Sequence, residues 1–126
     1  MAVKLKRAYE APTRADGYRV LVDRLWPRGV RKDDLRVDQW SKEVAPSTAL
    51  RQWYAHEPER WSEFQRRYLD ELDTDEGTAQ LRALAGRAAT GTVTLVFSAR
   101  DTDHNNAVVL KGAIERRARR RTTRRR

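Results

Sequence analysis

The residues best suited to chemistry lie in two short polar segments, and each segment lies at the end of a predicted strand. The first holds Asp23, Arg24, Trp26 and Arg28, directly after the apolar run at residues 20–22. An arginine there offers a planar fork of donors that suits phosphate or carboxylate, and Asp23 could orient an arginine or act as a general base. The alternative is an aspartate–arginine ion pair that fixes the turn, with Trp26 in the core.

The second polar segment runs from the last predicted strand into the last predicted helix, and its candidates are Arg100, Asp101, His104, Asn105 and Asn106. Backbone N–H groups at a helix start would favour an anion together with Arg100. Asp101 could act as a base, and the asparagines could orient a substrate or a water. The alternative is that these residues only cap and turn the chain. His104 lacks a paired-ligand spacing, so no metal site is predicted.

The two segments are expected to converge if their strands run parallel, because carboxyl ends then share one sheet edge. The resulting pocket would bind a small anion or the phosphate of a nucleotide or nucleic acid. No P-loop, GxGxxG, GxSxG or zinc-finger pattern occurs, so no cofactor is predicted. Hydrolytic or phosphoryl chemistry would suit the pocket better than redox chemistry. The residues leave open whether the protein is an enzyme or an interaction module.

Hydrophobic periodicity predicts the elements that must position these segments. Strands are expected at residues 3–7, 19–25, 37–45 and 92–98. Helices are expected after a cap at Ser47 or Thr48, from Pro58 to about residue 72, at 78–88, and at 105–117 after a cap at Thr102 or Asp103. Strands that alternate with helices indicate an α/β fold, namely a small three-layer open sheet, mostly parallel, with flanking helices. Residues 1–115 are expected to form one domain.

The basic character of the sequence resides in its last eleven residues. The net charge is +9, and eight arginines follow residue 115, namely Arg116, Arg117, Arg119, Arg120, Arg121, Arg124, Arg125 and Arg126. Without them, 19 basic residues face 18 acidic ones, so the body has no general basic face for nucleic acid. The tail, residues 116–126, is predicted to be disordered. It either contacts nucleic acid through phosphates or only keeps the chain soluble.

Composition also limits the location of the protein. No apolar run is long enough for a transmembrane span, and charged residues occupy the N-terminal stretch where a signal peptide needs apolar ones. Cysteine is absent, which excludes disulfides and thiolate catalysis and fits a reducing compartment. We therefore expect a cytoplasmic protein without a membrane partner, whose oligomeric state is open.

Three blocks resemble the YeaO-like branch of the domain-of-unknown-function 488 family: DGYRVLVDRLWPRG (16–29), WSKEVAPSTALR (40–51) and ARDTDHNNAVVL (99–110). The resemblance covers about residues 4–115 and implies a compact α/β fold with no established activity. The resemblance also implies that other branches of the family carry a Cys-His-Arg motif after the last strand. This chain has His104, Asn105 and Asn106 there and no cysteine, so thiol chemistry does not transfer. The resemblance adds Lys42, Glu43 and Ser47 as neighbours of the site.

Overall fold

The fold is built on a four-stranded parallel sheet. The structure is a computed structural model that describes the backbone of residues 2–124 and the side chains of residues 2–119. The strands are β1 (Ala2–Arg7), β2 (Tyr18–Leu21), β3 (Gln39–Trp40) and β4 (Thr92–Phe97), in the order β1-β4-β2-β3. All three strand pairs are parallel, so the carboxyl ends share one edge of the sheet. The predicted parallel α/β sheet is confirmed.

The central position of β4 follows from its residues. Leu95 pairs with Leu5 of β1 on one side and with Val20 of β2 on the other. From Val93 to Phe97 every residue of β4 is buried. A parallel strand covered on both faces needs a nearly continuous apolar run, and β-branched residues suit its extended backbone. The one polar residue, Thr94, donates its hydroxyl to the Asp16 carbonyl at 2.7 Å.

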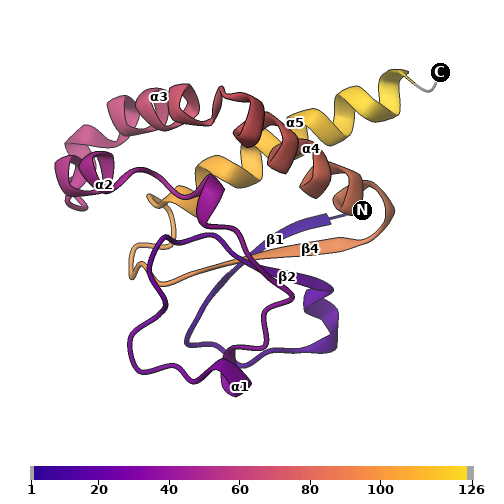
Figure 1. Cartoon of the computed structure of the whole chain (residues 1–126), viewed down its shortest axis with the longest axis horizontal. Helices are drawn as coiled ribbons and strands as arrows, with labels where there is room; N and C mark the ends of the chain where they lie inside the picture. The colour runs from indigo at the N-terminus through magenta and orange to yellow at the C-terminus, as the bar shows by residue number, and fades with distance from the viewer. Residues whose placement is uncertain (1, 125–126) are drawn as a thin grey trace.

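The helices are α1 (Lys32–Leu35), α2 (Thr48–Tyr54), α3 (Trp61–Leu72), α4 (Asp75–Thr90) and α5 (Asn106–Arg124), with single 3-10 turns at Arg14–Asp16, Lys42–Val44 and Pro58–Arg60. Figure 1 shows α3, α4 and α5 above the sheet and α1 below it. The main core lies between the sheet and these three helices. A smaller cluster on the opposite face joins Leu21, Leu35 and Val96 to two tryptophans. The sheet therefore lies between a thick helical layer and a thin layer of loops.

Two predicted strands are shorter than expected. The strand predicted at 19–25 ends at Leu21, and only the Val22 N–H, 3.1 Å from the Val96 carbonyl oxygen, extends its pairing. The strand predicted at 37–45 is reduced to β3, followed by a 3-10 turn. The Ser41 N–H still donates to the Leu21 carbonyl at 2.9 Å. Beyond Leu21, β2 offers β3 no further partner, so the edge strand stops.

The helix caps are partly as predicted. Ser47 caps α2, because its hydroxyl accepts the Leu50 N–H at 3.1 Å. The prediction of Thr102 or Asp103 as the cap of the last helix is wrong. Asn105 has that role, since its side-chain oxygen accepts the Val108 N–H at 3.2 Å.

The prediction of a disordered tail needs correction for residues 116–124, because α5 continues as a helix to Arg124. Arginine is a good helix former, and Ala118 packs against the main core. The helix therefore continues beyond its last apolar residue. The remaining tail residues, Arg125 and Arg126, lie outside the described residues. Within residues 2–124, no helix combines the length and apolarity needed to cross a membrane.

Candidate functional site

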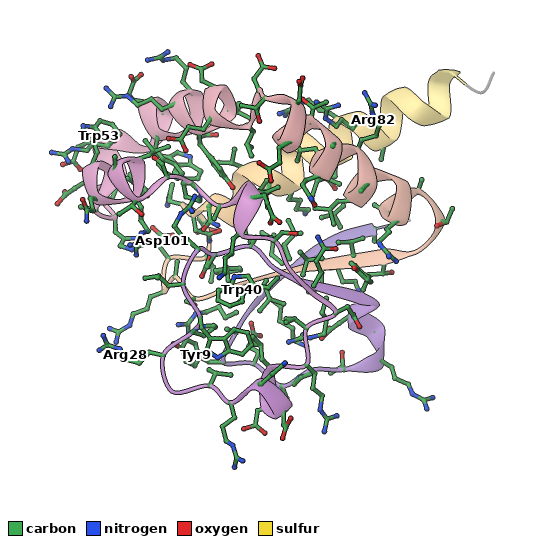
Figure 2. All side chains as sticks on the ribbon, in the orientation of Figure 1. Tyr9, Arg28, Trp40, Trp53, Arg82 and Asp101 are labelled. Atoms are coloured by element: carbon green, nitrogen blue, oxygen red, sulfur yellow. The ribbon has the colours of Figure 1, made fainter. Side chains whose placement is uncertain are left out.

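A cleft of about 920 Å³ opens beyond the carboxyl ends of β2 and β4. Its size falls within the range of small-molecule sites. The two polar segments meet there: the predicted residues that line it are Asp23, Arg24, Trp26, Arg28, Arg100, Asp101, Asn105 and Asn106. Figure 2 shows Tyr9, Arg28 and Asp101 on the same side of the molecule. The parallel sheet therefore places the ends of two distant segments around one opening.

The three residues suggested by the resemblance, Lys42, Glu43 and Ser47, lie outside this cleft lining. The Lys42 ammonium sits 4.0 Å from the centroid of the Trp40 ring, a cation–π contact. Ser47 caps α2, and its N–H and hydroxyl donate to the Glu71 carboxylate at 2.8 and 2.5 Å. The side chains of Lys42 and Ser47 therefore have partners that support the fold.

His104 also lies outside the lining, although its neighbours belong to it. Its Nδ1 is 3.1 Å from the Asp101 carboxylate, and its ring meets the Trp61 ring edge-on at 5.2 Å between centroids. Its carbonyl accepts the Tyr54 hydroxyl at 3.0 Å. His104 thus connects the loop after β4 to α2 and α3.

Asp23 forms the polar floor of the cleft. One carboxylate oxygen accepts the Ser98 N–H at 2.8 Å, and the other accepts the Asn106 side-chain amide at 3.2 Å. Asn106 also donates to the Val22 carbonyl at 3.0 Å. Burial raises the pKa of Asp23 above its ordinary value, and these hydrogen bonds and the Arg51 charge act against that rise. Asp23 therefore ties the ends of β2 and β4 to the start of α5.

Asp101 organises the loop that follows β4. Its Oδ1 accepts the backbone N–H groups of Asp103 at 2.9 Å and His104 at 3.1 Å. These bonds, the one from Asp103 above all, lower the pKa of Asp101. Asn105 donates to the Asp101 carbonyl at 2.8 Å, which completes the turn into α5. The carboxylates of Asp23 and Asp101 therefore both accept hydrogen bonds from the protein itself.

The arginines of the cleft divide into one that is engaged and three that are free. The Arg24 guanidinium donates to the carbonyls of Pro46 at 3.2 Å and Ala45 at 3.4 Å. The exposed side chains of Arg28, Arg51 and Arg100 form no hydrogen bond or ion pair with any described residue. The lining thus carries four arginines against two aspartates, and such an excess attracts anions.

The sequence did not predict the helical wall of the cleft, which consists of Arg51, Tyr54 and Phe64, with His56 in the turn after α2. Arg51 is the last residue of the segment 40–51, the one available signal. The chain leaves α2 through left-handed residues, with φ 47° at Ala55 and 58° at His56. This turn redirects the chain beside the cleft, and no pattern of apolar residues predicts it.

The described side chains do not gather metal ligands. Within residues 2–119, no group of three or more His, Asp or Glu side chains could hold a metal ion. The buried polar atoms of the described side chains all have hydrogen-bond partners. The charged groups of the cleft lining are therefore four arginines and two aspartates, and both aspartates accept hydrogen bonds from the protein.

Comparisons with known proteins identify the family of this chain. A family model described as "Inactive DUF488-N3 subclade" matches residues 2–126. An uncharacterized protein of Mycobacterium tuberculosis (strain H37Rv) is 50% identical over 108 residues, which cover 86% of this chain and 89% of that protein. The uncharacterized protein YeaO of Escherichia coli K12 is 44% identical over 110 residues, which cover 87% of this chain and 94% of YeaO. No solved structure matches. The chain therefore belongs to the DUF488 family, in the subclade that is described as inactive, and it is similar to YeaO.

Proposed function

We propose that the strand-end cleft binds a small phosphate-type anion and that the protein acts by binding rather than by catalysis. The observation that carries the proposal is the set of three free guanidinium groups, Arg28, Arg51 and Arg100, around one cleft. Guanidinium groups recognise phosphate oxygens by paired hydrogen bonds. Asn105 and Asn106 then serve as residues that hold the loop, and Trp26 supports the wall.

The absence of catalysis in this proposal rests on the two aspartates. A general base must be directed at the proton that it takes from the substrate. The Asp23 and Asp101 carboxylates are instead held in place by protein hydrogen bonds at both oxygens, and their remaining acceptor capacity serves a hydrogen-bond donor of the ligand. The description of the subclade as inactive supports the same view.

The test is calorimetric titration with inorganic pyrophosphate. The variant Arg28→Gln/Arg51→Gln/Arg100→Gln is expected to lose at least about tenfold in affinity, because each hydrogen bond to a charged group is worth about 1.5–3 kcal/mol. The matched control is Arg82→Gln, since Arg82 lies on α4, far from the labelled cleft residues in Figure 2. Equal affinity of the triple variant and the wild type would refute the proposal.

A second candidate function uses the basic end of α5. Because α5 continues to Arg124, it carries its arginines on one continuous helix that projects past the sheet (Figure 1). Such a helix could bind nucleic acid through phosphates, with an affinity that falls steeply with salt.

A short DNA duplex tests this second candidate. We expect binding that weakens steeply between low and physiological salt, and loss of that binding in Arg120→Gln/Arg121→Gln/Arg124→Gln. A control with the same loss of charge replaces three exposed arginines of the body by glutamine, namely Arg14, Arg31 and Arg82. Binding that is insensitive to salt, or equal in both variants, would exclude the α5 end as the cause.

A further inference from the structure

The cleft is larger and more apolar in its inner part than a bare phosphate requires. Phe64 is 2% exposed and Tyr54 is 4% exposed, and their rings stack at 4.4 Å between centroids. Both rings line the cleft from the helical side. Because both rings are almost fully buried, they form the apolar base of the cleft, and more exposed rings must supply any stacking surface.

The opposite side of the cleft is also aromatic. Tyr9 follows β1, and Trp26 lies in the loop after β2; both line the opening. The Tyr9 hydroxyl donates to the Arg28 carbonyl at 3.2 Å, so the two loops are fixed to each other. The Trp26 indole N–H donates to the Val30 carbonyl at 2.7 Å, which holds the ring in place. The exposed ring of Tyr9 and the half-buried ring of Trp26 therefore offer the accessible aromatic surface of the cleft, above the buried rings of Tyr54 and Phe64.

The charged residues are distributed unevenly between the floor and the rim of the cleft. Asp23 lies at the floor and is half-buried, whereas Arg28, Arg51 and Arg100 are exposed at the rim. A carboxylate repels phosphate, so the anionic end of a ligand belongs at the rim. Each oxygen of Asp23 has one protein donor and can accept a second N–H. The floor therefore suits an uncharged planar group that carries hydrogen-bond donors.

We infer that the ligand is a mononucleotide, whose aromatic base enters the inner cleft and whose phosphate remains with the arginines. This inference rests on the proposed anion-binding function. It adds to that function a recognition of the base by aromatic contact and by the Asp23 carboxylate. Stacking between bases and aromatic side chains tolerates different bases, so the aromatic walls favour nucleotides as a class.

The first test compares three probes by calorimetric titration of the full chain: AMP, ribose 5-phosphate and adenosine. AMP is expected to bind at least about tenfold more tightly than either of the other two, because only AMP has both a base and a phosphate. Equal affinity of AMP and ribose 5-phosphate would overturn the inference and leave anion binding intact. A protein that binds none of these probes and no pyrophosphate would overturn both.

A pair of variants at Tyr9 locates the base. Tyr9 is 50% exposed, so its replacement is compatible with folding. Tyr9→Ala is expected to weaken AMP binding several-fold and to leave ribose 5-phosphate binding unchanged. Tyr9→Phe keeps the ring and removes only the hydroxyl bond to Arg28, so it should bind AMP like the wild type. Unchanged AMP affinity in Tyr9→Ala would overturn the inferred position of the base between these walls.

Discussion

Replacement of Asp16 by alanine is expected to lower the free energy of unfolding by about 3–5 kcal/mol, the cost of leaving a buried charge without its partner. The Asp16 carboxylate lies 2.7 Å from the Arg19 guanidinium and 3.1 Å from the Lys6 ammonium. Asp16 is 5% exposed and Arg19 is 4% exposed. Arg19 also donates to the carbonyls of Leu35 at 2.7 Å and Arg36 at 3.2 Å, so it cannot turn out into water without breaking these bonds.

Urea denaturation measures this effect, and Asp70→Ala is the matched control. Asp70 forms an exposed ion pair with Arg66 at 3.5 Å. Exposed pairs contribute at most about 1 kcal/mol, so the control should unfold almost like the wild type. Equal losses in the two variants would contradict the buried role of Asp16.

The Asp16 carboxylate also predicts how the stability of the protein depends on pH. Burial alone would raise the pKa of Asp16, but the hydrogen bonds from Thr13, Lys6 and Arg19 outweigh it and hold the pKa below the ordinary 3.8. A lowered pKa in the folded state stabilises the protein above about pH 4, and this contribution disappears as the pH falls further. The raised pKa of Asp23 acts in the opposite sense, because its contribution is present in acid and disappears as the pH rises. Asp16→Ala should therefore lose stability less steeply in acid than the wild type.

Asp23→Ala is expected to lower the free energy of unfolding by about 2–4 kcal/mol. The substitution removes the side-chain acceptor of the Ser98 N–H and one of the two acceptors of the Asn106 amide. A buried donor that loses its partner costs about 1–3 kcal/mol. Asp23→Asn keeps one acceptor oxygen and should lose less stability than the alanine variant.

Denaturation curves for both Asp23 variants separate two roles for this residue. A carboxylate that ties β2, β4 and α5 together must cost stability when it is removed. Removal of a carboxylate that is kept free for proton transfer would cost little stability. A loss within about 0.5 kcal/mol, as is usual at unremarkable surface positions, would show that Asp23 does not hold the floor of the cleft together.

The sequence predicts the parallel sheet and the meeting of two polar segments, because strand-end loops in such a sheet share an edge. The sequence does not predict which arginine side chains lack a hydrogen-bond partner within the protein. Arg24 has the same fork of donors as Arg28, yet carbonyls of a distant segment occupy it. It also misses Arg51 and Tyr54, since α2 reaches the cleft only through tertiary packing. Local patterns specify elements, whereas the partners of a side chain depend on contacts between residues far apart in the chain.

The C-terminal end of α5 shows a related limit of prediction from the sequence. The charge of the segment after residue 115 indicates disorder by composition. Its helix nevertheless continues from a well-packed preceding stretch, in which Leu110 and Ile114 are fully buried. Elongation of an existing helix avoids the cost of nucleation, so a basic extension can follow an apolar one.

The most direct test of anion binding in the cleft is an NMR titration of the isotope-labelled full chain with inorganic pyrophosphate. The predicted result is a saturable set of shifts in the backbone and side-chain signals of residues 24–28, Arg51 and residues 98–106, with smaller shifts elsewhere. Shifts confined to the arginine-rich end of α5, or none at all up to millimolar pyrophosphate, would contradict the proposal that this cleft is the binding site.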